Sequence, residues 1–229
     1  MPIKFHSPER YFGDFARNYD RTVLNPDYKY TGVEHVFNTV AGFLSNNPQA
    51  TVLDVGCGTG LVGEKLKSEF PNITLLGIDI SAKMRAEARK KKTYSDLKKV
   101  DLERDRFPFK EDSIDLIVSS ATFDYVKKLS PSFKEISRVL KPKGELCVTT
   151  YAGEDEQNEF LRRMANADSD LANYTRIDVH DYERPPLEIT MLFASVGIQA
   201  KHLTTFDAFR AFEGGDKGTQ YHLFSGIKR

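Results

Sequence analysis

The stretch TVLDVGCGTG, residues 51–60, largely decides which fold the chain adopts. It begins as a short run of apolar and β-branched residues, which predicts a buried strand. Asp54 follows, and then glycines stand at every second position from Gly56. Because glycine has no Cβ, such a turn lets a ligand approach the backbone closely. The alternative is an ordinary tight turn that binds nothing.

Strand and helix patterns alternate after this turn. The expected strands are 51–56, 73–80, 97–103, 113–120 and 145–151, and the expected helices between them are 60–70, 81–92 and 131–140. This alternation is typical of βαβ units in a parallel sheet with helices on both faces. A further helix at 187–197 precedes two strands, 198–206 and 219–229. We therefore predict an α/β fold: a doubly wound, mostly parallel seven-stranded sheet that ends in an antiparallel hairpin.

Two regions stand outside this alternation within what we expect to be a single domain, residues 1–229. The first is an N-terminal helical region, 1–47, with aromatic residues at helical spacing in 8–24 and a second helix at 31–47, which Thr31 would cap. The second is a polar insert, 152–185, predicted to be helical at 153–170 and a loop at 176–186. We expect the first region to act as a lid and the second to shape a substrate site.

Composition limits the classes of function. Lys plus Arg and Asp plus Glu both number 33, and this neutral balance argues against a nucleic-acid partner. The two cysteines cannot make a disulfide framework, and no spacing suggests a metal site. The chain shows neither a signal peptide nor an apolar run of membrane-spanning length. These features predict a cytoplasmic protein without a membrane or metal, as a monomer or homodimer.

A second carboxylate, Asp79, ends the next expected strand. Ligands of parallel sheets bind beyond the carboxyl ends of the strands, where strand order reverses. The glycines and Asp79 thus predict a nucleoside pocket in which the carboxylate accepts hydrogen bonds from ribose hydroxyls. The pattern is G-x-G-x-G and not the G-x-G-x-x-G of dinucleotide turns. Asp54 would repel a pyrophosphate and suit a cationic ligand, although a nicotinamide dinucleotide remains an alternative.

Five blocks of the sequence resemble the class I S-adenosylmethionine-dependent methyltransferases, and most of all the branch that acts on small molecules. VLDVGCGTG is similar to the first motif of that family and GIDIS to the second. VDLERDRFPFKEDSIDLIVSSATFDYV is similar to the third and fourth, and EISRVLKPKGELCVTTY to the fifth. The resemblance covers residues 8–151 well and the remainder loosely. It implies a Rossmann-like fold with S-adenosyl-L-methionine as cofactor.

The resemblance also implies roles for single residues. Asp54 faces the amino group of the cofactor, directly or through water, Asp79 binds its ribose and Asp101 binds its adenine. The residues implied to bind the cofactor are Tyr11, Tyr19, Asp54, Gly56, Cys57, Gly58, Thr59, Gly60, Asp79, Ile80, Met84, Asp101, Leu102, Ser119 and Ala121. The alternatives are a solvated loop position for Asp101 and core positions for Tyr11 and Tyr19.

The methyl acceptor is less well defined by the sequence. We expect contacts from Phe15, Asp124, Tyr125, Tyr151 and His180, because the N-terminal helices and the insert usually build this side of the fold. An aromatic wall would suit a flat or cationic small molecule. The family often has a histidine where this chain has Asp124, so the candidate catalytic residues are Asp124 and His180. A helix-start position for Asp124 and an exposed loop for His180 are the alternatives.

These features together predict an enzyme that transfers a methyl group to an O, N or S atom of a small molecule by in-line displacement. A general base is needed only if the acceptor must lose a proton. No NPPY-type motif follows DLIVSS, which argues against the amino groups of bases or a glutamine amide as acceptor. A protein methyltransferase and a catalytically inactive partner protein that binds the cofactor are the alternatives.

Overall fold

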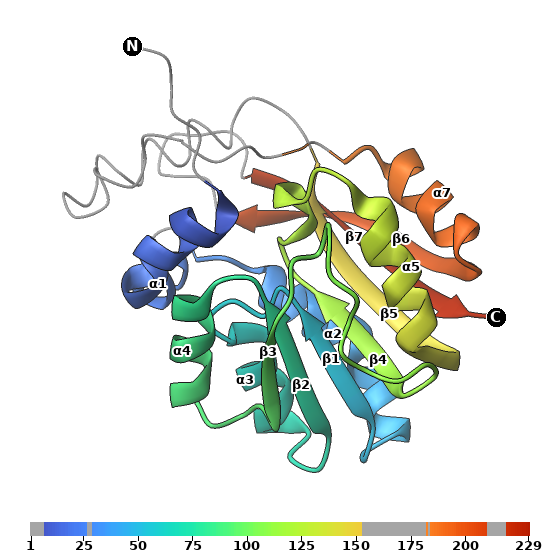
Figure 1. The fold of residues 1–229 in the computed structure, drawn as a ribbon, viewed down its shortest axis with the longest axis horizontal. Coiled ribbons are helices and arrows are strands. Elements are labelled where there is room, and N and C mark those ends of the chain that lie inside the picture. The colour runs from blue at the N-terminus through green and yellow to red at the C-terminus, as the bar shows by residue number, and fades with distance from the viewer. Residues whose placement is uncertain (1–6, 27–28, 153–181, 183, 210–218) are drawn as a thin grey trace.

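The structure is a computed structural model that describes residues 7–26, 29–152, 182, 184–209 and 219–229. The helices are α1 (Pro8–Val23), α2 (Gly32–Asn46), α3 (Leu61–Glu69), α4 (Ala82–Lys90), α5 (Leu129–Val139), α7 (Pro186–Ser195) and a short 3-10 helix, η1 (Phe123–Tyr125). The strands are β1 (Thr51–Val55), β2 (Thr74–Asp79), β3 (Asp96–Lys99), β4 (Ile114–Ser119), β5 (Leu140–Tyr151), β6 (Ile198–Phe209) and β7 (Thr219–Lys228). Figure 1 shows their arrangement.

The strands form one seven-stranded sheet in the order β3-β2-β1-β4-β5-β7-β6. Strands β1 to β5 are parallel, and β7 runs antiparallel to both β5 and β6. This confirms the predicted doubly wound sheet with a C-terminal antiparallel hairpin. Strand order reverses between β1 and β4, so the carboxyl ends of these strands are the expected place for a ligand.

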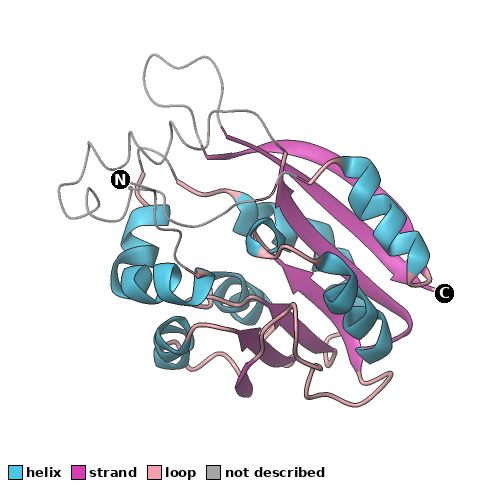
Figure 2. Cartoon of the chain, turned by 45° about the horizontal axis from the view of Figure 1, so that its top comes forward, coloured by secondary structure: helices cyan, strands magenta, loops and turns pink. Residues whose placement is uncertain are grey.

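Alternation along the strands divides the core into two layers (Figure 2). Val52 packs with α2 and α3 on one face of the sheet, whereas Leu53 and Val55 pack with α5 and α7 on the other. This is the period of two that a pleated strand imposes. Both faces are apolar because helices cover both, as in parallel sheets generally.

Helix α1 packs against α4. It begins at an N-cap, Ser7, whose hydroxyl accepts from the Arg10 main-chain N–H at 3.4 Å. Pro8 fits the first turn because it has no main-chain N–H, and an N–H at this position would have no partner within the helix. Two ion pairs join α1 to the sheet and to α4: Lys99 with Glu9 at 3.0 Å, and Lys83 with Asp14 at 2.7 Å. The sequence predicts the helix and does not predict where it packs.

The cap predicted for the second helix differs in the structure. Thr31 precedes α2, but its side chain makes no capping hydrogen bond. Its hydroxyl donates instead to the Asp207 carbonyl oxygen at 2.7 Å. Tyr30 bridges to Phe209 beside it. A tertiary contact with β6 has therefore replaced the local one, and Thr31 has φ −97° and ψ −9°, outside the extended conformation that is usual for an N-cap.

Two strand boundaries also differ from prediction. Strand β5 begins at Leu140, because Leu140 already pairs with Ile114 on β4, whereas the sequence KPKG at 141–144 predicts a break. Strand β3 ends at Lys99, which leaves Asp101 in a loop. The predicted helix 153–170 lies outside the described residues. So does most of the predicted loop 176–186, of which 182 and 184–186 are described.

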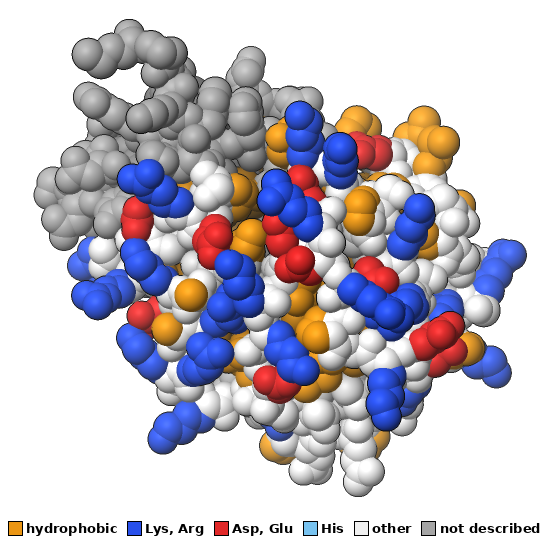
Figure 3. All heavy atoms as spheres, in the orientation of Figure 1, with side chains coloured by type: hydrophobic (Ala, Val, Ile, Leu, Met, Phe, Trp, Pro, Cys, Tyr) orange, Lys and Arg blue, Asp and Glu red, His pale blue; other side chains and the backbone are white. Residues whose placement is uncertain are grey.

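On the face seen in Figure 3, Lys and Arg side chains are spread widely, with fewer Asp and Glu side chains between them. Among the helices of the described ranges, none combines the length and the apolar character that a membrane crossing needs.

The aromatic core under α5 gives a test of the fold. Phe133 is 0% exposed, and its ring centroid lies 5.1 Å from that of Phe123 and 5.9 Å from that of Phe193. We expect Phe133→Ala to lower the free energy of unfolding by about 3–5 kcal/mol, because it leaves a cavity in a well-packed site. Urea denaturation measures the change. The control is Leu187→Ala on α7, which is 68% exposed and should change stability by less than about 0.5 kcal/mol; equal effects would contradict this packing.

Candidate functional site

A cavity of about 470 Å³ lies at the carboxyl ends of β1, β2 and β4. Its walls come from the glycine turn after β1, the end of β2, the loop after β3, the loop after β4 and helix α1. Of the residues implied to bind a cofactor, those that line it are Tyr19, Gly56, Gly58, Asp79, Ile80, Met84, Asp101, Leu102 and Ala121. Residues far apart in the sequence thus meet at the point where strand order reverses.

The three glycines of the turn all have positive φ, at 71° for Gly56, 52° for Gly58 and 88° for Gly60. They serve different purposes. A Cβ on Gly56 would lie 2.2 Å from the Thr122 side chain, so this glycine makes room for protein. A Cβ on Gly58 would meet nothing within 4 Å, although Gly58 lines the cavity. Of the three glycines, Gly58 is the one that leaves open space at the cavity. The expectation that all three make room for a ligand therefore narrows to Gly58.

Asp79 ends β2 and presents its carboxylate to the cavity. Its Oδ2 accepts from the Gly58 main-chain N–H at 2.9 Å, and its Oδ1 accepts from that of Ser81 at 2.7 Å. Each carboxylate oxygen has a second lone pair, so the group retains acceptor capacity. Burial raises the pKa of Asp79, against the lowering effect of these two hydrogen bonds and of the Arg85 charge.

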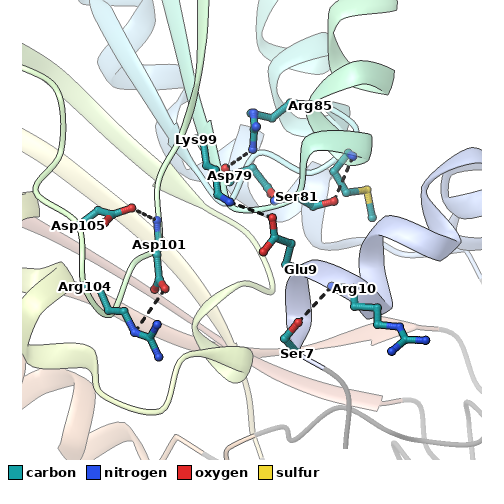
Figure 4. A network of polar contacts seen from close by, with 11 residues as sticks. Ser7, Glu9, Arg10, Asp79, Ser81, Arg85, Lys99, Asp101, Arg104 and Asp105 are labelled. Atoms are coloured by element: carbon teal, nitrogen blue, oxygen red, sulfur yellow. Dashed lines mark hydrogen bonds and ion pairs between the residues drawn. The ribbon is translucent and has the colours of Figure 1, made fainter.

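Arg85 is a nearly buried cation behind Asp79. It is 8% exposed, and its Nη1 donates to the Asp79 carbonyl oxygen at 2.6 Å. Figure 4 shows Arg85 reaching from α4 to the end of β2, and Glu9 of α1 reaching Lys99 nearby. The guanidinium offsets part of the negative charge of the site and fixes the strand end that carries the carboxylate.

Asp54 lies behind the glycine turn and does not line the cavity. It is 1% exposed, and the Tyr94 hydroxyl donates to its Oδ2 at 2.6 Å. Burial raises the pKa of Asp54 to about 7, the hydrogen bond from Tyr94 lowers it, and the nearby charge of Asp79 raises it. The predicted interaction of Asp54 with the amino group of a cofactor would therefore act across the turn or through water.

Helix α1 is fixed to the turn by a small polar cluster. The Thr59 hydroxyl donates to the Asp20 carboxylate, and Lys91 pairs with the same carboxylate at 2.8 Å and with Glu64 at 2.6 Å. Tyr19, the residue before Asp20, lines the cavity. Thr59 therefore holds α1 on the turn and is not part of the cavity wall.

Several other residues implied to bind a cofactor stand away from the cavity wall. Ser119 is buried, and its hydroxyl donates to the Val55 carbonyl oxygen at 2.8 Å. Ser120 lines the cavity in its place, because successive residues of a strand point to opposite sides. The others are Tyr11, Cys57 and Gly60. Burial raises the pKa of the Cys57 thiol, so it stays neutral and fills space.

One end of the cavity has an aromatic wall made by Phe12, Tyr19, Tyr125 and Tyr182. The ring centroids of Phe12 and Tyr125 lie 4.8 Å apart in an edge-to-face arrangement. The Tyr182 main-chain N–H donates to the Asp124 carbonyl oxygen at 2.6 Å, which joins this residue to η1. Elements from both halves of the chain thus build one apolar surface.

Arg184 and Tyr30 support this end from behind. The buried Arg184 guanidinium donates to the Val126 carbonyl oxygen, pairs with Glu188 at 3.1 Å and lies 5.1 Å from the Tyr182 ring centroid. The Tyr30 hydroxyl lies 2.8 Å from the Ser120 hydroxyl. Burial raises the pKa of Tyr30 to about 12, so this phenol is neutral and cannot serve as a base near neutral pH.

Three of the predicted acceptor contacts do not line the cavity. Tyr125 lines it, whereas Phe15, Asp124 and Tyr151 are buried behind it. Asp124 Oδ1 accepts from the Tyr151 main-chain N–H at 2.8 Å, so it joins η1 to β5. A position next to a strand end does not decide whether a side chain faces the cavity or the core. His180 lies outside the described residues.

Sequence reasoning missed several residues of the site. Thr122, Val126, Lys127, Glu103 and Arg104 line the cavity, and Tyr94 supports it from behind. The sequence marks none of them, since loop residues carry no periodic pattern. Ala121 has φ 51°, which is uncommon outside glycine and is typical of constrained loops at functional sites. Within the described ranges, no group of His, Cys, Asp and Glu could hold a metal ion.

Comparison with known proteins identifies a family for part of the chain. Residues 53–148 match the family model described as a methyltransferase domain. A malonyl-[acyl-carrier protein] O-methyltransferase from Methylovorus sp. (strain MP688) is 30% identical over 193 residues, which are 76% of this chain and 64% of that protein. The enzyme of the same name from Priestia megaterium is 28% identical over 147 residues, 61% of this chain and 49% of that protein. The chain thus spans about half to two thirds of the length of these curated relatives.

Solved structures support the fold. Magnesium protoporphyrin IX methyltransferase from Synechocystis PCC 6803 with bound SAH is similar to the chain with a TM-score of 0.70. It is 14% identical, and the alignment covers 96% of this chain and 97% of that one. At this identity the likeness concerns the fold alone.

The raised pKa of the buried Asp54 carboxyl predicts how the stability of the protein depends on pH. Because of this pKa, the folded chain binds more protons than the unfolded chain between about pH 4 and pH 7. Wild-type stability therefore falls relative to Asp54→Asn as pH rises through this window. At about 1.4 kcal/mol per pKa unit, we expect the difference to widen by about 2–3 kcal/mol from pH 5 to pH 8. Urea unfolding at both pH values measures it.

A control separates this effect from the general loss of a charge. Asp14→Asn removes a carboxylate that is about half exposed and paired with Lys83 on the surface. Its difference from wild type should stay constant over the same pH range. If the Asp54→Asn difference were equally constant, the carboxyl would be ionised in the folded protein at every pH tested.

Proposed function

We propose that the chain, of which residues 53–148 match a methyltransferase domain, is a class I S-adenosylmethionine-dependent methyltransferase that methylates an O, N or S atom of a small molecule. The observation that carries the proposal is the cavity at the carboxyl ends of β1, β2 and β4. Its lining includes the open Gly58, the Asp79 carboxylate and the aromatic wall. A cofactor and an acceptor can therefore meet within one cavity.

The residues present suit S-adenosylmethionine. Gly58 lets a ligand lie against the turn, since no atom would meet a Cβ there within 4 Å. Asp79 keeps acceptor capacity for ribose hydroxyls. At the turn, Arg85 is the buried guanidinium beside Asp79, and Asp54 adds a second negative charge where it is ionised, which favours a cationic ligand over a pyrophosphate. Met84 and Leu102 add apolar surface for an adenine.

The chemical step requires little of the protein beyond placing the acceptor in line with the methyl group. S-adenosylmethionine supplies, when bound, a methyl group on a sulfonium that is already a good leaving group. The residues of the chain then bind, orient and exclude water, which can account for a large part of such a rate. Tyr19 and Phe12 of α1 cover one side of the cavity, and Ser120 offers a hydroxyl to an acceptor.

A carboxylate oxygen is the acceptor atom that we propose. Among the described residues that line the cavity there is no histidine that could act as a base. Two cations line it, Arg104 and Lys127, and so do four carboxylates, Glu9, Asp79, Asp101 and Glu103, so the choice rests on the missing base and not on the charge of the lining. A carboxylic acid is already ionised near neutral pH, so it needs no general base. The relatives named as malonyl-[acyl-carrier protein] O-methyltransferases act on a group of this kind by their names, which supports the same choice.

Methyl-labelled S-adenosylmethionine tests the proposed acceptor. The panel contains simple carboxylic acids, malonyl thioesters on coenzyme A and on an acyl carrier protein, and phenols, amines and thiols. We expect the label in a base-labile methyl ester. Label only in phenols, amines or thiols would exclude the carboxylate, label only in proteins would indicate a protein methyltransferase, and binding without any transfer would indicate an inactive partner protein.

Asp79 is the first residue to test for cofactor binding. We expect Asp79→Ala to weaken binding of S-adenosylmethionine and S-adenosylhomocysteine by about tenfold or more, because it removes charge-assisted hydrogen bonds. Calorimetric titration measures the dissociation constants, with thermal unfolding beside it to check that the variant is folded. A change of less than twofold in a folded variant would remove Asp79 from the ribose site.

Gly58 has a matched control in Gly197. Both have positive φ and open space around the Cβ position, and Gly197 follows α7 far from the cavity wall. An alanine at either position should destabilise the folded protein by a similar backbone strain of about 1–2 kcal/mol. We expect Gly58→Ala to weaken S-adenosylhomocysteine binding at least tenfold and Gly197→Ala to leave it within twofold. Equal effects on binding would show that the turn makes no room for the ligand.

A further inference from the structure

Tyr94 occupies a slot beneath the glycine turn. Three glycines leave the space for this slot. A Cβ on Gly60 would lie 2.9 Å from its ring, one on Gly63 would lie 2.3 Å from its hydroxyl, and one on Gly77 would lie 2.9 Å from its ring. Gly63 lies in α3 and Gly77 in β2, where a glycine costs about 0.5–1 kcal/mol relative to alanine. The ring therefore accounts for two glycines that helix and strand would otherwise disfavour.

The hydroxyl of this buried ring has a specific partner. It donates to Asp54 Oδ2 at 2.6 Å, from the loop between α4 and β3 to the end of β1. Asp54 is 1% exposed, so its charged form needs a donor to offset the loss of water. A phenylalanine at position 94 would fill the same slot without this donor. Packing of the ring therefore does not explain why position 94 carries a hydroxyl, whereas the hydrogen bond to Asp54 does.

The other groups that face Asp54 determine how its charge behaves. Asp79 contributes a second negative charge from β2, and Arg85 on α4 acts as a cation on Asp79 and Cys57. Burial raises the pKa of Cys57 and of Tyr94, so both stay neutral. Burial also raises the pKa of Asp54 to about 7. Asp54 is therefore a group behind the turn that can change charge near neutral pH, and burial raises the pKa of Asp79 on the cavity side as well.

Building on the proposed function, we propose that Tyr94 is a positioning residue of the cofactor site: its hydroxyl holds the Asp54 carboxyl behind the turn, where it loses a proton when a cationic ligand binds. The ammonium of the ligand's amino acid part stabilises the carboxylate across the turn. The proton leaves to solvent, and no bond of the ligand is made or broken. Binding is then coupled to the release of up to one proton, and of about half a proton at pH 7.

This coupling makes cofactor affinity depend on pH in a defined direction. Below about pH 7 the carboxyl of the free protein is mostly protonated, and the ligand must displace that proton. Affinity for S-adenosylhomocysteine should therefore fall by up to about tenfold per pH unit below pH 7 and level off above it. The range pH 5.5 to 7.5 suits the test, because an α-amino group stays largely protonated there.

Tyr94→Phe tests the role of the hydroxyl while it keeps the ring in its slot. Loss of the hydrogen bond should raise the pKa of Asp54 and move the midpoint of the affinity curve up by about one pH unit. Calorimetric titration with S-adenosylhomocysteine should then show about tenfold weaker binding at pH 6.5. Repeating the titration at pH 7 in two buffers of different ionisation enthalpy measures the protons released.

Two further variants act as controls. Asp54→Asn should bind the ligand with an affinity that does not change over this pH range. Tyr94→Phe in the Asp54→Asn background should then produce no shift, because the group that the hydroxyl positions can no longer titrate. Thermal unfolding verifies that each variant is folded under the conditions of the titration.

The outcomes separate this inference from the proposed function. A Tyr94→Phe curve that is displaced upward in pH, together with a flat Asp54→Asn curve, supports the inference. An affinity lowered by the same factor at every pH, with an unmoved midpoint, overturns it and reduces Tyr94 to a packing residue. A wild-type protein that binds neither S-adenosylhomocysteine nor S-adenosylmethionine overturns the proposed function and this inference together.

Discussion

The site depends on a sharp turn of backbone that follows β1 and holds two carboxylates near each other. The main-chain N–H groups of Gly56 and Cys57 donate to the Ile78 carbonyl oxygen at 2.8 and 3.0 Å, which joins the turn to the end of β2. Asp79 accepts from Gly58 on the cavity side, and Asp54 lies behind. The two carboxyl groups can both be ionised only with compensation, and the surrounding residues supply part of it.

The compensation comes from separate elements of the chain. Arg85 reaches the end of β2 from α4, and Tyr94 reaches Asp54 from the next loop. Helix α1 is fixed over the turn through Asp20, which bonds Thr59 and Lys91. The same contacts that stabilise the turn therefore close the cavity, so stability and ligand binding are coupled at this place.

The outline of the fold is readable in the sequence because strand and helix periods are local. Val52 and Leu53 point to opposite layers as alternation predicts, and Asp79 ends its strand at the cavity. Errors arise where a neighbour in space overrides a local preference. Thr31 gives up its capping hydrogen bond for Asp207, and 141–144 continues β5 although its composition indicates a break.

The sequence by itself determined the parallel sheet, its antiparallel C-terminal hairpin and the turn at its carboxyl edge, because these follow from periodicity and from the backbone freedom of glycine. Tertiary structure alone decided which side chains face the cavity. Ser120 faces it and Ser119 does not, and Asp124 is directed to the Tyr151 main chain. Tyr94 is the clearest case. Its ring fills a slot left by three glycines that are distant from it in the sequence, and no local sequence pattern predicts which residue fills that slot. Side-chain orientation is settled by packing between elements, which a linear pattern does not contain.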